Sequence, residues 1–229
     1  MAQKINPNSF RLGLTIPWSS RWFPKKQNRF FIEEDHLIRK MVHEKLLTAG
    51  IVGVDIERTG DTMRVSIKAS RPGFIIGRGG KGIEDFKEAL RRALRSLRIK
   101  NKLPFNMNFS LNIEELKRTE ISAKVAAQQI AFELQKRLPY RGVLKRQLEA
   151  MMQNREVQGA KIKLAGRLNG AEIARQDWLA RGRMPLQTLR ANIDYGEATA
   201  FNSYGTVGIK VWLYKGEIFE EKKKVDNRK

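Results

Sequence analysis

The chain of 229 residues contains no cysteine and only two histidines. Without cysteine it can form neither disulfides nor thiolate metal sites. His36 and His43 stand seven positions apart with no further ligand pattern around them, so the sequence predicts no metal site. No serine near either histidine carries a nucleophile motif, which argues against a hydrolytic triad. We therefore predict that the protein is not an enzyme and uses no cofactor or small-molecule substrate.

Long apolar runs and acidic residues are also scarce. No stretch of 18 apolar residues and no signal-peptide layout is found, so neither a membrane span nor secretion is indicated. Only 24 Asp and Glu oppose 45 Lys and Arg, which leaves a net charge of +21. A chain this basic requires a polyanion, either nucleic acid or an anionic membrane surface. The arginines of residues 83–98 lie beside an apolar stripe typical of a protein core, so we predict no membrane partner and favour nucleic acid.

The densest local signal is the stretch 71–83, which reads Arg-Pro-Gly-Phe-Ile-Ile-Gly-Arg-Gly-Gly-Lys-Gly-Ile. Glycines at this density leave backbone N–H groups uncovered and tolerate positive φ without a Cβ penalty. Such a loop in front of a helix can hold a phosphate against the bare backbone. Arg78 and Lys81 add positive charge within the loop, so its ligand is expected to be negative.

Three phosphate-binding motifs compete for this loop. The nucleotide-binding P-loop fails, because Gly82 stands where Ser or Thr is required and Ile75 where its first glycine is required. The dinucleotide motif Gly-x-Gly-x-x-Gly is matched literally, but no acidic residue follows about 20 positions later. The third motif is Gly-x-x-Gly between two helices, matched by residues 77–80, with which KH domains hold about four nucleotides by their backbone. A glycine-rich turn without a ligand stays open as an alternative.

The surrounding pattern favours the third motif. Helical spacing from Asp35 to Leu46, with Asp35 as the cap, is followed by two alternating segments at 52–56 and 63–69 that form a hairpin. A short helix before the loop, a helix over 83–97 and a strand over 105–113 complete an α-β-β-α-α-β order. This is the order of a type II KH domain, which we assign to residues 31–113.

Residues 114–216 predict a second unit. Helical stripes at 121–138 and 143–152 precede strands at 161–164, 191–195 and 207–213. The predicted fold class is therefore α+β: a KH domain followed by a sandwich-like domain with two helices on a mostly antiparallel sheet. Residues 1–30 are expected to form an extended N-terminal arm, and residues 217–229 a charged tail. The arm carries Trp18, Trp22 and Phe23, which either stack on bases or cover the edge of a core.

Further motifs along nearly the whole chain resemble one family. The matching segments are Asn6-Pro7, Phe10–Gly13, Arg71–Gly73, Gly77–Gly80, Gly166–Leu168, Gly170–Arg175, Gly182-Arg183, Pro185-Leu186, Thr188–Ala191, Ile193–Tyr195, Tyr204-Gly205, Val207–Trp212 and Lys215–Ile218. Together they resemble the S3 family of bacterial small-subunit ribosomal proteins, which carry a KH domain at the entrance channel for messenger RNA.

The resemblance implies a structural constituent of the small-subunit head, cytoplasmic within the ribosome. Its expected partners are ribosomal RNA, messenger RNA and neighbouring ribosomal proteins of the head. The implied RNA-binding residues are Arg11, Arg71, Gly77, Arg78, Gly79, Gly80, Lys81, Arg167, Arg175, Arg183 and Arg190. The implied messenger-channel residues are Arg141, Lys145 and Arg146.

Two alternatives remain open at this stage. Related proteins commonly have a second basic residue where this chain has Gly142, so its hold on messenger RNA is expected to be weaker, and a solvated helix face is the simpler interpretation of Arg141 and Lys145. A KH-domain RNA-binding factor or RNA chaperone that is not built into the ribosome would share the charge and the loop.

Overall fold

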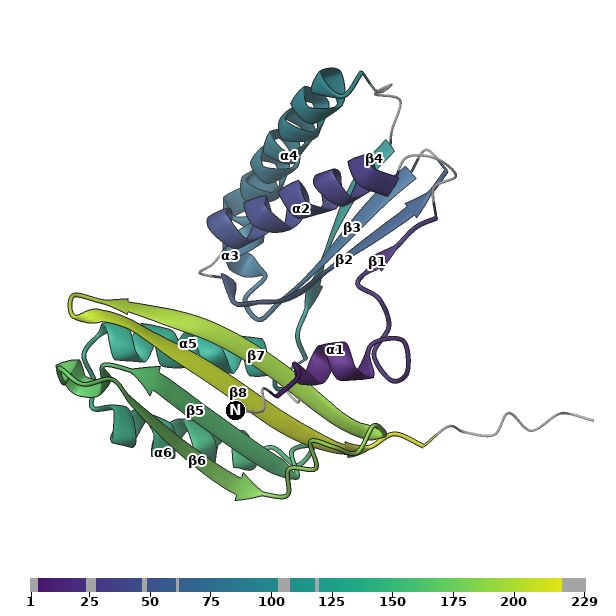
Figure 1. Ribbon diagram of the computed structural model, residues 1–229. Coiled ribbons are helices and arrows are strands. Elements are labelled where there is room, and N and C mark those ends of the chain that lie inside the picture. The colour runs from purple at the N-terminus through teal and green to yellow at the C-terminus, as the bar shows by residue number, and fades with distance from the viewer. Residues whose placement is uncertain are drawn as a thin grey trace, which may run out of the picture. The chain divides into compact units, whose positions relative to one another are not determined.

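The computed structural model describes residues 4–23, 28–46, 49–60, 62–102, 108–117 and 120–219. The chain forms two compact units: the KH unit, residues 18–129, and the C-terminal unit, residues 130–229 with the first 17 residues. The elements, shown in Figure 1, are α1 (Pro7–Arg11), β1 (Ser20–Arg21), α2 (Asn28–Lys45), β2 (Ile51–Thr59), β3 (Thr62–Ala69), α3 (Gly73–Ile76), η2 (Arg78–Gly80), α4 (Lys81–Lys100), β4 (Asn108–Glu115), α5 (Ala123–Gln135), α6 (Tyr140–Met152), β5 (Gly159–Gly166), η3 (Leu168–Gly170), β6 (Arg175–Gly182), β7 (Ala191–Asn202) and β8 (Gly205–Glu217).

The KH unit is a sheet with two long helices on one face. Its described strands follow the order β1-β2-β3-β4, in which β2 and β3 form the predicted antiparallel hairpin and β4 runs parallel to β3. Helices α2 and α4 cover the same face of this sheet (Figure 1). The α-β-β-α-α-β order of the sequence prediction is confirmed. The part of the last strand predicted at 105–107 lies outside the described residues.

Helix α4 shows why periodicity located these elements. Phe86, Leu90 and Leu94 recur every four residues and are buried against the sheet, whereas Arg91 and Arg92 between them are exposed. Each large apolar side chain removed from water stabilises the fold by roughly 1.5–3 kcal/mol. The stripe interpreted from sequence as core is therefore core, and Arg91 and Arg92 beside it remain at the surface.

The first residues are more structured than the extended arm expected from sequence. Asn6 caps the short helix α1 by accepting a hydrogen bond from the N–H of Asn8 at 2.9 Å, and α1 packs on β7 of the C-terminal unit. Strand β1 instead belongs to the KH unit, where it pairs in parallel with β2. The segment is thus ordered by long-range partners, which local composition does not reveal. The domain boundary assigned after residue 113 stays a prediction.

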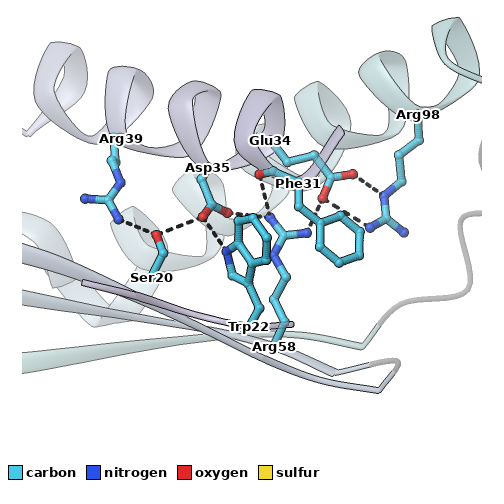
Figure 2. Close-up of polar contacts among 8 residues, drawn as sticks. All are labelled: Ser20, Trp22, Phe31, Glu34, Asp35, Arg39, Arg58 and Arg98. Carbon is cyan, nitrogen blue, oxygen red and sulfur yellow. Dashed lines mark hydrogen bonds and ion pairs between the residues drawn. The ribbon is translucent and has the colours of Figure 1, made fainter. Parts of the chain in front are cut away.

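A buried ionic cluster joins the two helices of the KH unit to its sheet (Figure 2). The carboxylate of Glu34 accepts hydrogen bonds from Arg98 Nε at 2.6 Å and from Arg58 Nη1, while Arg58 Nη2 donates to Asp35. The side chains of Arg58 and Arg98 are only 4% and 8% exposed. Two carboxylates facing two guanidiniums keep the cluster formally neutral, which is the condition for burying charge at this depth.

The same cluster holds the segment around β1. Asp35 Oδ2 accepts hydrogen bonds from Ser20 Oγ and from Trp22 Nε1, both at 2.8 Å, and the Trp22 ring meets Phe31 edge-on at 5.5 Å (Figure 2). Trp22 therefore covers the edge of the core. Trp18 and Phe23 are exposed, so the choice between stacking and packing stays open for them.

The cluster also corrects the expected start of the first KH helix. Asp35 was expected to cap a helix that begins there, but α2 begins at Asn28 and Asp35 lies buried within it. Asp35 instead binds Arg58, Ser20 and Trp22, which lie in or beside β1 and β2, and the helical pattern of its own segment does not indicate these partners.

The C-terminal unit is an antiparallel sheet with helical cover. The strand order is β6-β5-β8-β7, and every described pairing is antiparallel. Helix α6 packs on β5 and β6, and its apolar side is buried. The predicted architecture of two helices on an antiparallel sheet is confirmed (Figure 1). Strand β6 was not predicted, because it is an edge strand that is exposed along most of its length and lacks an alternating pattern.

Candidate nucleic-acid interface

The glycine loop follows α3 and ends at the start of α4. Gly77, Gly79 and Gly80 have φ values of 70°, 61° and 79°, a region that L side chains rarely adopt. Gly82, the second residue of α4, is needed for a different reason: a Cβ there would lie 2.9 Å from the carbonyl oxygen of Ile75. The glycines thus allow α3 and α4 to approach each other closely with a tight loop between them (Figure 1).

One side chain beside the loop is buried in the KH core, and the others are exposed to solvent. Ile75 is buried in the KH core, whereas Phe74 and Ile76 on either side of it are exposed. Arg78 and Lys81 project from the loop and are also exposed. Exposed apolar groups beside a cationic loop at a helix N-terminus can contact both the bases and the phosphates of a single strand.

Arg71 belongs to the same end of the KH unit. Its backbone N–H donates to the carbonyl of Ala49 at 3.1 Å, which fixes the backbone between β3 and α3. Its side chain is exposed, so it can add a third cation to Arg78 and Lys81. The structure thus brings together Arg71 and residues 77–81 of the predicted site in one region of the chain.

A second basic surface lies at the start of α6. Arg141 and Lys145 stand one helical turn apart and are exposed, as the four-residue spacing predicts. Arg141 Nε donates to the hydroxyl of Tyr140 at 3.1 Å, which orients the guanidinium over the helix start. Arg146 differs from both, because its Nη2 lies 2.8 Å from Glu133 in an ion pair. Arg141 and Lys145 therefore carry the exposed charge of this surface.

The remaining predicted cations of the C-terminal unit differ in their partners. Arg175 and Arg183 are exposed at the two ends of β6. Arg167 donates to the carbonyls of Ala171 and Tyr204 at 2.8 and 2.9 Å and so braces two loops. Arg190 pairs with Glu217 at 2.6 Å. Arg175 and Arg183 therefore keep the full exposure that an RNA contact needs, whereas Arg167 and Arg190 also have structural partners.

Arg11 contradicts the expectation of an RNA contact. It is fully buried, and its guanidinium donates to the carbonyls of Ala191, Leu186 and Thr188 at 2.8–3.0 Å and to Pro7 at 3.1 Å. Burial lowers its pKa from the ordinary value. A guanidinium enclosed by four carbonyls has no face left for a phosphate, so Arg11 fastens α1 to β7 and the segment before it.

The other clear pKa shifts in the C-terminal unit follow from packing. The Lys161 ammonium lies 4.6 Å from the ring centre of Trp178, and burial, followed by the charges of Lys4 and Lys163, lowers its pKa. Burial and the hydrogen bond from its hydroxyl to Glu197 raise the pKa of Tyr195. Both shifts follow mainly from burial within the unit.

Within the described residues, no three histidine, acidic or cysteine residues are gathered where they could hold a metal ion. No helix in the described ranges combines the length and the apolar character needed to cross a membrane.

Comparison with known proteins decides the family. Residues 37–121 match the KH domain family, and residues 130–213 match the family described as ribosomal protein S3, C-terminal domain. The small ribosomal subunit protein uS3 of Maridesulfovibrio salexigens is 46% identical over 220 residues, which cover 96% of this chain and 98% of that protein. The chain belongs to the uS3 family. The uS3 protein of Thermotoga maritima is 43% identical over 218 residues, which cover 95% of this chain and 99% of that protein.

Membership of the uS3 family confirms the resemblance drawn from the sequence motifs. The glycine loop lies within the KH match, and the start of α6 lies within the S3 match. The cations on both segments are exposed, whereas Arg11 is buried. The individual roles of the exposed residues remain predictions.

Proposed function

We propose that this chain is built into the head of the small ribosomal subunit, where it binds ribosomal RNA and lines the path of incoming messenger RNA. As a member of the uS3 family it is a structural, non-enzymatic protein of that subunit, which binds RNA during translation. The ribosomal location implies a cytoplasmic one. Neighbouring ribosomal proteins are expected partners for those surfaces that do not contact RNA.

The observation that supports the messenger path is the exposed pair Arg141 and Lys145. Both side chains are exposed on the first two turns of α6, and Glu133 is engaged by Arg146 and Gln147 at 2.8 Å each. The exposed pair can neutralise two phosphates of a passing strand.

The glycine loop is proposed to hold an RNA backbone in the KH unit. Positive φ at Gly77, Gly79 and Gly80 keeps the loop open to a phosphate, and Arg78 and Lys81 supply charge. In the full chain, Arg78→Asp combined with Lys81→Asp should weaken binding of single-stranded RNA and flatten the salt dependence. Each lost phosphate contact changes the log–log slope by about 0.7 on single strands.

Incorporation is tested by sedimentation of the tagged full chain through a sucrose gradient in roughly half-molar salt, where exposed electrostatic contacts are strongly screened. Recovery with the small subunit supports the proposal. Recovery only at the top of the gradient, with RNA bound at low salt, would instead favour a KH-domain factor or chaperone outside the ribosome.

The messenger path is tested on small subunits that carry Arg141→Glu with Lys145→Glu. These subunits should lose affinity for a messenger that extends through the entrance but not for one that ends at the decoding region. The charge-matched control is Arg155→Glu with Lys210→Glu, which alters two exposed cations elsewhere in the C-terminal unit. Equal losses for both messengers, or for the control, would contradict the proposed path.

A further inference from the structure

A pocket of about 330 Å³ opens in the C-terminal unit beside the start of α6. The turn between α5 and α6, the η3 turn and the hairpin between β7 and β8 form its walls. Its floor is apolar and includes Leu134, Leu168 and Val207, which are buried. Its volume falls in the range of about 300–1,000 Å³ that is usual for ligand sites.

The walls of the pocket carry three aromatic rings. Tyr140, Phe201 and Tyr204 line it, and Phe201 and Tyr204 are 71% and 55% exposed. Both rings therefore present a large part of their surface at the mouth of the pocket. Aromatic side chains over an apolar floor are suited to a flat, apolar ring that enters between them.

The pocket is braced before any ligand arrives. The Tyr204 ring rests on Gly170, where a Cβ would lie 3.1 Å from Tyr204 Cδ2, and Arg167 Nη1 donates to the Tyr204 carbonyl. On the facing wall, the N–H of Tyr140 donates to Asn169 Oδ1 at 3.4 Å. Contacts that already fix the walls reduce the entropy lost when a ligand binds.

The rim of the pocket is positively charged. Arg137 lines the mouth, reaches Ser203 Oγ at 3.5 Å and is exposed, and the exposed Lys136 precedes it. Arg141 lies next to the Tyr140 wall with its guanidinium 5.7 Å from the ring centre. A ligand that fits both the rings and this rim carries a flat base and negative charge, which is the chemistry of a nucleotide within a polyanion.

We propose that this pocket takes one unstacked base of the messenger RNA whose phosphates lie along Arg141 and Lys145. This inference rests on the proposed messenger path. The base stacks on Phe201 and Tyr204 while Arg137 contacts its phosphate, so that the strand is held at one nucleotide as well as along its backbone. Base–aromatic stacking is tolerant of sequence, because every base presents a flat face.

The test is photo-crosslinking of the full chain to a single-stranded uridine 12-mer that contains 4-thiouridine, with the crosslinked peptides identified by mass spectrometry. Crosslinks are expected on the β7–β8 hairpin peptide that carries Phe201 and Tyr204. An abasic 12-mer should compete for these crosslinks roughly 5- to 150-fold less well than the uridine 12-mer, since stacking contributes about 1–3 kcal/mol per base. Crosslinks confined to other peptides would overturn the inference.

Matched variants separate the pocket from the rest of the basic surface. Phe201→Ala should remove most of the hairpin crosslinks, whereas Phe201→Tyr, which retains a ring, should preserve them. Phe201 is exposed at a strand end, so both variants are expected to fold. Trp178→Ala, which alters an exposed ring that does not line the pocket, should leave the crosslinks unchanged. Equal crosslinking in wild type and Phe201→Ala would refute the stacking role.

The failure of this inference and that of the messenger path can be distinguished. If Arg141→Glu with Lys145→Glu weakens messenger binding while no crosslink reaches the hairpin, the path stands and the pocket is refuted. If the hairpin crosslinks persist in that charge variant but disappear in Phe201→Ala, the pocket stands and the path along α6 is wrong. In small subunits that carry the full chain, hairpin crosslinks to ribosomal RNA alone would overturn the assignment to messenger.

Discussion

Glu34 is the residue on which the KH unit is expected to depend most strongly. Its side chain is completely buried, and its two oxygens accept from Arg98 Nε at 2.6 Å, from Arg98 Nη2 at 3.2 Å and from Arg58 Nη1. The substitution Glu34→Gln preserves the volume but replaces one accepting oxygen by an NH₂ donor. That donor faces a guanidinium, which has no acceptor to offer.

The expected loss of stability follows from the burial of these charges. Breaking a buried ion pair by neutralising one partner destabilises a protein by about 3–5 kcal/mol, because the remaining charge stays desolvated. The exposed pair Glu88 and Arg92 on α4 provides the matched control, since both side chains are more than 70% exposed and 3.4 Å apart. Surface pairs of this kind contribute about 0–1 kcal/mol. Glu34→Gln and Glu88→Gln make the same chemical change, the first at a buried position and the second at an exposed one.

Urea unfolding followed by circular dichroism measures the difference. With an m value of about 2 kcal/mol/M, a loss of about 4 kcal/mol lowers the midpoint by about 2 M. Glu88→Gln should shift it by less than about 0.5 M. Combining Glu34→Gln with Arg98→Gln should give a loss smaller than the sum of the two single losses, by about 0.5–3 kcal/mol. A midpoint for Glu34→Gln equal to that of Glu88→Gln would refute the reasoning.

Three further predictions concern other parts of the chain. Arg11→Met should lower stability by about 3–5 kcal/mol in urea unfolding, because it removes the buried guanidinium that donates to four carbonyls, while the salt slope of RNA binding stays unchanged. Gly142→Ala should stabilise the chain by about 0.4–1 kcal/mol in the same assay, since a Cβ there meets only Pro139 at 3.8 Å. Gly142→Arg should stabilise the chain less than Gly142→Ala does, and it should steepen the salt slope of single-strand binding by about 0.7. The pKa of His43 is lowered from its ordinary value by burial, then by the charges of Lys124 and Arg39. As pH falls below about 6.5, His43 is therefore protonated in the unfolded chain before it is protonated in the folded one, and stability declines. The urea midpoints of wild type and His43→Gln should diverge only in this acidic range.

The elements of the fold that were predictable are those whose apolar side chains repeat at a regular spacing. Phe86, Leu90 and Leu94 in α4 and the alternating residues of β2 and β3 report their own burial. Because a buried face is mostly apolar, the spacing of its apolar residues follows the period of the helix or strand. The elements that were missed lack such a face. Strand β6 is held by pairing with β5 at a sheet edge, and β1 by two residues paired with β2.

The glycine loop was predictable for a different reason. Gly77, Gly79 and Gly80 require positive φ, and Gly82 permits the close approach of α3 to α4, so the residue type itself reports the backbone geometry. The pocket beside α6 was not predictable. Its walls come from residues 134–140, 168–170 and 201–207, which are far apart in the sequence and meet only because β5, β7 and β8 pair in one register.

The amino-acid composition overstates the positive charge that is available to RNA. Arg11, Arg58 and Arg98 count toward the net charge as Arg141 does, but their side chains are buried against carbonyls or carboxylates of the chain itself. Since a guanidinium carries five donors in a rigid plane, it satisfies several buried acceptors at once, and this suits it to internal bracing as well as to phosphate binding. The net charge of +21 therefore describes attraction to a polyanion at a distance. Contact with RNA is limited to those cations whose acceptors lie outside the protein.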